Sequence, residues 1–241
     1  MSQILFCNKQ FENTVRQALN VFDRPIFDED VEKITELDLL DFSFQSEDFA
    51  ILIKFKKLIS LAISTSAWKF NFLKALHNLE DLYIENWNEY NICAFNEFKN
   101  LPKLKHLTVS GGTYSYIQFI NLENLLPLNH LKSLSLHEFG FVNLLPLANY
   151  TQLESFYCGY GKRVANISVI EKFFALKSLS LLGLKLKNLD FLNALPINLK
   201  LELCGLELDE EINVDKLRRF TNYDISEITV QGRMIIGGDG L

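Results

Sequence analysis

Cysteine is sparse in this 241-residue chain, and the sequence lacks the segments that direct or anchor a protein. The four cysteines, Cys7, Cys93, Cys158 and Cys204, form no close pair of the kind that holds zinc or acts as a redox couple. The first residues contain no apolar core of about 7–15 residues, as a signal peptide needs. No window approaches the roughly 18 uncharged apolar residues of a membrane span. We therefore expect a soluble protein of a reducing, cytoplasmic compartment, with no membrane partner.

Motifs that bind phosphate or metals or that carry hydrolysis are missing as well. The chain has no Gly-rich phosphate loop, no HExxH and no GxSxG. Its four histidines, His77, His106, His130 and His137, have no partner ligand at a spacing of four residues. The net charge of -6 argues against nucleic acid as a partner, because such binding depends on basic side chains. We expect no cofactor, no metal and no enzymatic activity.

Leucine is abundant, with 42 residues, and it repeats. The pattern L-x-x-L-x-L, with other apolar residues allowed, recurs nine times, and its middle residue returns every 21 to 27 residues. The copies are Ile34-Leu37-Leu39, Leu58-Leu61-Ile63, Leu79-Leu82-Ile84, Leu104-Leu107-Val109, Leu131-Leu134-Leu136, Leu153-Phe156-Cys158, Leu176-Leu179-Leu181, a degenerate Leu201-Leu203, and Ile225-Ile228-Val230.

The repeat predicts an α/β solenoid. In L-x-L two buried residues alternate with an outward one, which is the pattern of a short strand with one buried face. The segments between strands are apolar but too short and too often interrupted by proline for long helices. Because one unit cannot bury its apolar face alone, neighbouring units stack, and their strands form a parallel sheet on the concave side. We expect one elongated, monomeric domain.

These repeats resemble those of leucine-rich repeat proteins, and the front of the chain resembles the helical cap of bacterial internalin-type members. Phe11, Val15 and Leu19 have helical spacing, and Asp28 is a candidate cap for a second short helix that runs to Lys33. We expect an N-terminal cap over residues 1–33, repeats over 34–208, and the last strand (225–230) with a C-terminal cap over 209–241. In that last segment, two β-prone runs around Gln231-Gly232-Arg233 predict a hairpin.

One position departs from the family pattern. Family repeats usually carry asparagine five residues after the middle leucine, where its side chain bonds the backbone of neighbouring turns. Here that position holds Phe42, Ser66, Trp87, Gly112, Phe139, Gly161, Leu184, Leu206 and Arg233. These corners must therefore be held by packing or by water.

The register of the repeat predicts which charged residues lie on the concave face. We count the first leucine of each copy as position one. Positions three, five, seven and eight are then expected to point away from the core on the concave side. Their acids are Glu36, Asp38, Asp41, Asp81, Glu85, Glu138, Glu202 and Glu227, and Lys200 is their only base. Eight acids and one base give this face a net charge of -7. Position two adds Glu80 and Glu154 against Lys105, Lys132 and Lys177, which brings the total to -6.

Aromatic side chains interrupt the acidity. Tyr83, Trp87, Tyr114, Tyr116, Tyr157 and Tyr160 fall on or beside the third, fourth and sixth copies. Tyrosine and tryptophan are enriched at interface hot spots because they bury a large area at little entropic cost. The predicted binding residues are Asp81, Tyr83, Glu85, Trp87, His106, Tyr114, Tyr116, His137, Glu138, Tyr157 and Tyr160.

The resemblance implies a module that binds macromolecules with its concave face, and an acidic face favours a basic protein. One hypothesis is a cytoplasmic immunity protein, an inhibitor that neutralises a toxin. Another is a secreted bacterial effector that acts by binding a host protein. A remote third is a hydrolase, because the third positions of successive copies place Asp81, His106 and Ser133 in one row. A sheet face offers neither an oxyanion hole nor a pocket that excludes water.

Overall fold

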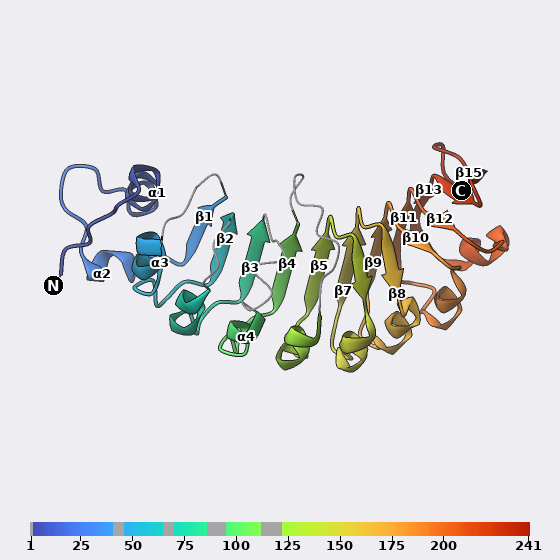
Figure 1. Ribbon diagram of the computed structural model, residues 1–241, viewed down its shortest axis with the longest axis horizontal. Helices are drawn as coiled ribbons and strands as arrows, with labels where there is room; N and C mark the ends of the chain where they lie inside the picture. The colour runs from blue at the N-terminus through green and yellow to red at the C-terminus, as the bar shows by residue number, and fades with distance from the viewer. Residues whose placement is uncertain (1, 41–45, 65–69, 86–94, 112–121) are drawn as a thin grey trace. The chain divides into compact units, whose positions relative to one another are not determined.

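The computed structural model describes residues 2–40, 46–64, 70–85, 95–111 and 122–241 (Figure 1). The chain forms two compact units, Met1–Ser115 (unit 1) and Tyr116–Leu241 (unit 2), and each is described by itself. The expectation of a single elongated domain stays a prediction. No helix in the described part of the chain has both the length and the apolar character that a bilayer span requires.

Unit 1 begins with the predicted helical segment. Helix α1 spans Lys9–Leu19, the Asn8 side chain accepts the first free backbone N–H groups, and Phe11 and Val15 are fully buried. Helix α2 spans Asp28–Val31, so it is shorter than expected. Its cap residue is Phe27, and Asp28 is already the first helical residue. The other helical segments of this unit are α3 Ser46–Leu52, the 3₁₀ helix η1 Asn71–Ala75, and α4 Phe95–Phe98.

The carboxylate of Asp30 holds the N-terminus of α2. It accepts two hydrogen bonds of 2.7 Å from the Arg24 guanidinium and one of 3.0 Å from the backbone N–H of Phe27. Asp30 is buried, and the Arg24 guanidinium holds the pKa of its carboxyl well below the usual range. This ion pair fixes the chain where it enters the helix.

The main sheet of unit 1 is parallel, as the repeat predicts. Its strands, in order, are β1 Glu36–Leu39, β2 Ser60–Ser64, β3 Asp81–Glu85 and β4 His106–Ser110. The register places Leu37, Leu61, Leu82 and Leu107 side by side, and all four are buried. The middle leucine of each of these copies therefore lies in the core.

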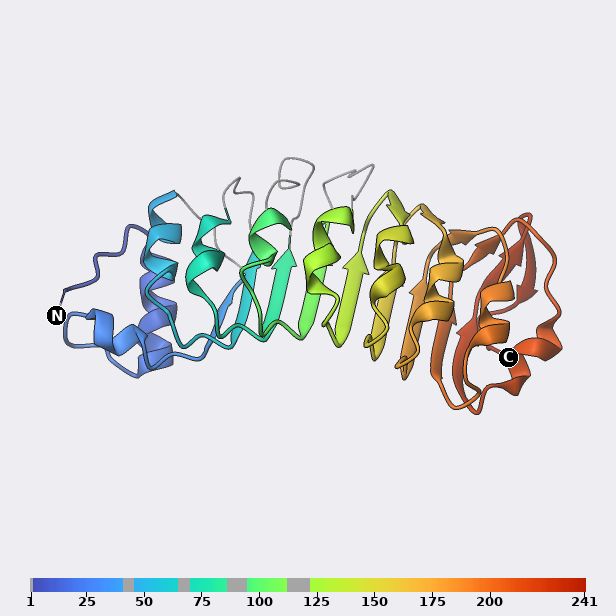
Figure 2. The same ribbon diagram turned by 90° about the horizontal axis from the view of Figure 1, so that it is seen from below.

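Unit 2 continues the same design. The strands of its main sheet, in order, are β5 Ser133–His137, β7 Ser155–Gly159, β9 Ser178–Leu182, β11 Lys200–Cys204 and β13 Asn222–Ser226. Behind them lie 3₁₀ helices (Figure 2): η3 Leu122–Leu128, η4 Leu145–Asn149, η5 Ile167–Lys172, η6 Asp190–Ala194 and η7 Val214–Arg219. Their brevity confirms that the segments between strands do not form long helices.

Short strands beyond the corners of unit 2 form two further sheets. One pairs β6 Phe141–Asn143 with β8 Arg163–Ala165. The other, called here the second sheet, consists of β10 Lys185–Leu186, β12 Glu207–Leu208, β14 Ile228–Val230 and β15 Arg233–Ile236. Strands β14 and β15 are antiparallel and are joined at Gln231 and Gly232, which both have positive φ. This is the predicted hairpin, and β15 covers the last edge of the second sheet.

The register of the ninth copy differs from the prediction. The ninth strand of the repeat is β13, and it places Tyr223 beside Leu201 and Ile225 beside Leu203. The step from Leu201 to Tyr223 is 22 residues, so the ninth copy reads Phe220-Tyr223-Ile225. The expected strand over 225–230 is wrong, because Ile228–Val230 belongs to the second sheet. Tyr223 keeps an exposure of 37%, although this position is buried in the other strands of the unit.

The corners that follow the strands of unit 2 are held by backbone hydrogen bonds. The first residue after each of these strands has a left-handed backbone, with φ between 54° and 63°; the five are Glu138, Tyr160, Gly183, Gly205 and Glu227. The N–H of each donates to a carbonyl of the following chain segment, over 2.7 to 3.3 Å. One residue further on, Phe139, Leu184 and Leu206 are buried. Packing is confirmed at the corners of Phe139, Leu184 and Leu206, and this direct backbone ladder adds to it.

Candidate functional site

The outward side of each main sheet, called here the open face, faces away from the helical segments (Figure 2). In unit 1 it carries four of the predicted binding residues. Asp81, Tyr83 and Glu85 alternate with buried residues along β3, and His106 lies beside Asp81 at the start of β4. The described positions three, five and seven of this unit hold the acids Glu36, Asp38, Asp81 and Glu85, and none of them holds lysine or arginine.

The side chains of Asp81 and His106 lie too far apart for a hydrogen bond in this structure. Their side chains come within 3.9 Å, from Nε2 to Oδ1, and both are about half exposed. A catalytic hydrogen bond requires about 2.6–3.2 Å. Ser133, the third residue of the suspected row, belongs to unit 2. Among the described residues, no group of three or more His, Cys, Asp or Glu side chains is arranged to hold a metal ion.

In unit 2 two aromatic rings are stacked on the open face. The rings of His137 on β5 and Tyr157 on β7 have centroids 4.2 Å apart and planes 23° apart. The Tyr157 ring leans along its own strand over Gly159, because a Cβ built on Gly159 would lie only 2.4 Å from the tyrosine hydroxyl oxygen. Burial lowers the pKa of His137, and the charge of Glu138 opposes part of that shift. Because Gly159 has no side chain, the Tyr157 ring can lie over it and stack on His137.

Tyr160 and Glu138 stand beside this stack at two of the left-handed corners. Tyr160 follows β7 and is 64% exposed, and its ring lies against Gly183 of the next corner. Glu138 follows β5 directly after His137. We call His137, Tyr157 and Tyr160 the aromatic shelf. The structure thus brings four predicted residues together within unit 2.

Acidic side chains continue the open face of unit 2 beyond the shelf. Glu202 on β11 accepts a hydrogen bond of 2.7 Å from the hydroxyl of Ser180. Asp224 lies beside Glu202 on β13, and Glu227 follows that strand at the last corner. Together with Glu138, these are the acids at positions three, five, seven and eight of unit 2. The one base at these positions is Lys200. The corrected register adds Asp224 to the face and moves Glu227 from position three to position eight.

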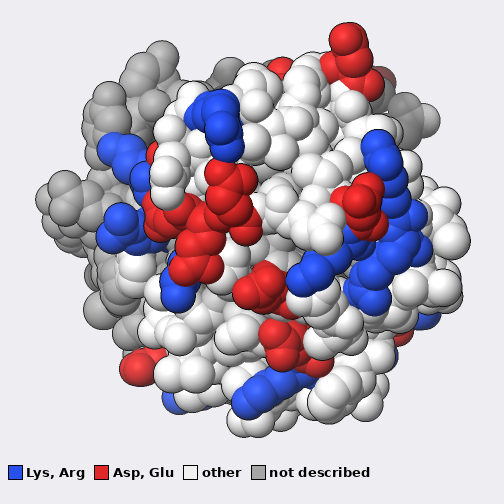
Figure 3. All heavy atoms as spheres, turned by 90° about the vertical axis from the view of Figure 1, so that its right-hand side faces the viewer, with Lys and Arg blue, Asp and Glu red and all other residues white. Residues whose placement is uncertain are grey.

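Several ion pairs lie away from the open face. At position two, the ammonium of Lys105 lies 2.6 Å from Glu80, and those of Lys132 and Lys177 lie 3.3 and 2.5 Å from Glu154. On and beside the second sheet, Lys185 pairs with Glu207, Lys187 with Glu210 and Arg233 with Glu211, over 2.7 to 3.2 Å. Figure 3 accordingly shows basic and acidic side chains next to one another at this end of the unit.

Three predicted binding residues, Trp87, Tyr114 and Tyr116, lie outside the described residues, as does Asp41 among the predicted acids. Tyr83 belongs to unit 1, whereas Tyr157 and Tyr160 belong to unit 2. The predicted cluster of six aromatic residues therefore stays a prediction, and the part that the structure describes as one assembly is the aromatic shelf.

The geometry matches known solved structures. An internalin C2 from Listeria monocytogenes is 20% identical, with a TM-score of 0.73 over 96% of this chain and 99% of its own. A leucine-rich repeat protein from Leptospira interrogans is 16% identical, with a TM-score of 0.54 over 85% of this chain and 57% of its own. This chain has a leucine-rich repeat fold. No protein-family model and no curated protein sequence matches it.

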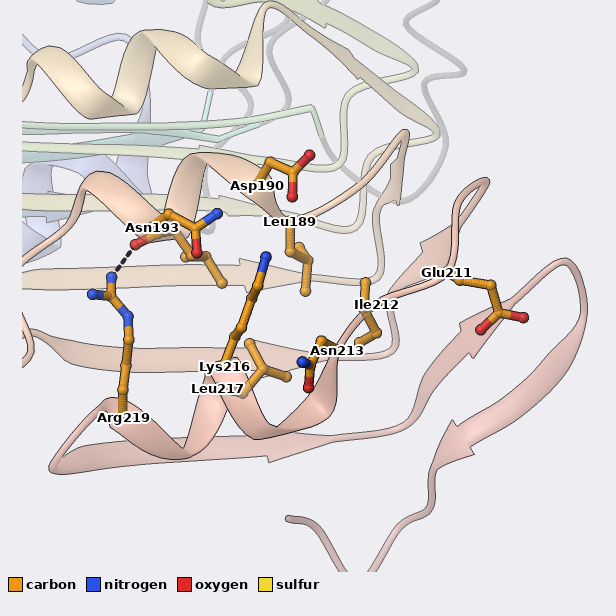
Figure 4. A pocket seen from close by; sticks show the side chains of 10 residues that line it. Leu189, Asp190, Asn193, Glu211, Ile212, Asn213, Lys216, Leu217 and Arg219 are labelled. Carbon is orange, nitrogen blue, oxygen red and sulfur yellow. Dashed lines mark hydrogen bonds between the residues drawn. The ribbon is translucent and has the colours of Figure 1, made fainter.

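On the side of unit 2 that carries the 3₁₀ helices, a hollow lies between η6 and η7 (Figure 4). Asp190 and Asn193 line it from one side, and Lys216 and Arg219 from the other. The Arg219 guanidinium donates to the backbone carbonyl oxygens of Leu192 and Leu195, so it serves the end of η6. The hollow is lined by charges of both signs, and its Arg219 stabilises the end of η6.

Three contributors to the site were missed from the sequence. Gly159 and Ser180 lie at outward positions that the alternation of the repeat identifies. A glycine or a serine at such a position does not by itself indicate a binding role. Asp224 was assigned to no copy, because Ile225-Ile228-Val230 fits the repeat pattern better than Phe220-Tyr223-Ile225 does. An alignment of the last copy on the 22-residue step would have found it.

Proposed function

We propose that this protein is a non-enzymatic module that binds another protein through the open face of its leucine-rich repeats, and that the partner is basic. One observation carries the proposal: at the described positions three, five, seven and eight of the repeats, eight acids stand against one base, Lys200. A surface with such an excess of acids attracts a basic partner at long range and disfavours an acidic one. The fold supports the choice, since the resemblance to leucine-rich repeat proteins implies binding through this face.

The test compares two variants with the same change of charge. In the open-face variant, Glu202→Gln, Asp224→Asn and Glu227→Gln remove three acids. In the control variant, Glu207→Gln, Glu210→Gln and Glu211→Gln remove three acids on and beside the second sheet. Wild type and both variants are used to capture proteins from a bacterial lysate, and binding of the captured basic proteins is then measured with purified components.

We expect the open-face variant to lose affinity and the control variant to keep it. Binding by wild type should also weaken as the salt concentration rises, because the Debye length falls to about 8 Å at physiological ionic strength. Equal losses in both variants, or no loss in either, would contradict the assignment of binding to the open face.

Within this function, we propose an immunity role, in which the partner is a toxin domain and the complex forms in the cytoplasm. Nucleases and other proteins that bind nucleic acid have the basic surfaces that an acidic face suits. The test is co-expression with the toxin of an adjacent gene: wild type should rescue growth and the open-face variant should not. A chain that instead enters host cells in a translocation assay, and fails to rescue, would be an effector.

A further inference from the structure

The aromatic shelf of unit 2 has an exposed ring, and its two tyrosine rings pack against glycine residues. Tyr157 lies over Gly159, and Tyr160 lies against Gly183, so each ring rests on a position that has no side chain. The stack with His137 holds Tyr157 flat, since the two rings are only 4.2 Å apart. Tyr160 is 64% exposed, and its left-handed corner is fixed by a hydrogen bond of 2.7 Å from its N–H to the carbonyl of Leu182. The rings are therefore positioned before any partner arrives.

Two glutamates, Glu138 and Glu202, lie on the same face as these rings. Burial raises the pKa of the Tyr157 hydroxyl to about 12, and the nearby charges of Tyr160, Glu202 and Glu138 act in the same direction. Glu138 follows β5, the strand next to β7, and its N–H donates to the carbonyl of Gly159. Glu202 lies two strands from Tyr157, beyond Ser180 of β9. The hydrogen bond from Ser180 holds the Glu202 carboxylate in place on that side.

A ring face and a carboxylate together select a cation. The face of an aromatic ring carries partial negative charge and attracts ammonium and guanidinium groups. Arginine suits such a site better than lysine, because its planar guanidinium stacks on a ring while its N–H groups bond to carboxylates. Anions are repelled here, and a purely apolar side chain would gain nothing from the carboxylates.

We propose that the aromatic shelf binds an arginine side chain of the partner, with the guanidinium stacked on Tyr160 and directed toward Glu138 and Glu202. This inference rests on the proposed function, and it names the group on the partner that the open face recognises. It also assigns roles: the rings give specificity for arginine, and the acids give attraction.

The experiment measures fluorescence anisotropy with labelled hexa-arginine and hexa-lysine peptides as probes. Tyr160 is replaced by Phe, Leu and Ala. The three variants are matched, because each keeps a Cβ at the same left-handed corner and the side chain is mostly exposed. Thermal unfolding of each variant verifies that it folds.

We expect Tyr160→Phe to bind hexa-arginine as wild type does, because it keeps the ring. Tyr160→Leu and Tyr160→Ala should each bind it about two- to fivefold more weakly, which is the range of a cation–π contact at an exposed site. Hexa-lysine should bind more weakly than hexa-arginine to wild type, and the difference should shrink in the Leu and Ala variants.

The outcomes separate this inference from the function on which it rests. If the open-face acid variant binds hexa-arginine as tightly as wild type does, the proposed function fails. If that variant loses affinity while the Tyr160 series stays flat, the acidic face stands and the arginine site is refuted. Equal binding of the two peptides by wild type, or a Leu variant as good as the Phe variant, also refutes it.

Discussion

Adding a single methyl group at Gly159 should dismantle the aromatic shelf without disturbing the sheet. The Cβ of alanine would lie 2.4 to 2.8 Å from the hydroxyl oxygen and two ring carbons of Tyr157, so the ring must swing away. Losing the stack with His137 costs about 0.5–1.5 kcal/mol. Replacing glycine by alanine restricts the unfolded chain and returns about 0.4–1 kcal/mol. Gly159→Ala should therefore change the free energy of unfolding by less than about 1 kcal/mol.

The sensitive measurement is the pKa of His137, followed by NMR. Burial keeps this pKa below its ordinary value of 6.5, and the Tyr157 ring provides part of the burial. In Gly159→Ala the pKa should rise toward 6.5. The unfolded chain binds this proton more readily than the native protein, so wild type loses stability as the pH falls from 6.5 through the lowered pKa. That loss should be smaller in the variant.

Gly232→Ala is the matched control. Gly232 has a φ of 78° and nothing within 4 Å of its Cβ direction, so alanine there strains the backbone by about 1–2 kcal/mol and touches no ring. It should lower stability and leave the pKa of His137 unchanged. An unchanged pKa in Gly159→Ala, together with unchanged binding of hexa-arginine, would refute the account of the shelf.

Three further predictions concern stability. Asp30→Asn should lower the free energy of unfolding at pH 7. The gap to wild type should close in urea titrations as the pH falls from 3.8 toward the lowered native pKa, because the carboxyl of the unfolded chain is protonated first and the stability gained from the lowered pKa is lost. Tyr150→Phe should cost about 1–3 kcal/mol in urea unfolding, because the buried hydroxyl donates to the carbonyl of Leu125, and that oxygen would lose its donor. In hydrogen exchange, amides of β15 that bond to β14 should be protected, and fast exchange throughout β15 would contradict the hairpin.

The strands of the fold can be predicted from the sequence, because burial on one side of a strand leaves a period of two that any reader can count. Leu37, Leu82 and Leu179 each lie in the core where the pattern places them. The ninth copy could not be read this way. Tyr223 occupies a position that other strands fill with a buried apolar residue, and β13 is the last strand of its sheet, where a half-exposed tyrosine is tolerated.

The candidate site was only partly predictable. The alternation assigned His137, Tyr157 and Tyr160 to one face, but it gives no information on where a ring leans. That direction depends on Gly159, whose missing side chain opens space over its own strand. The backbone ladder at the corners was also beyond pattern reading, because a main-chain hydrogen bond does not depend on which side chain is present.

That independence has a consequence for how the surface can change. At the five left-handed corners of unit 2 a main-chain hydrogen bond holds the turn, so the turn itself does not require a particular side chain. Glutamate, tyrosine and glycine already occupy these corners. The binding specificity of the repeats can therefore be changed by substituting these corner residues alone. The cost in stability is the strain that the new residue suffers in the left-handed conformation. Asparagine, which tolerates that conformation, is the natural first substitution at Gly205.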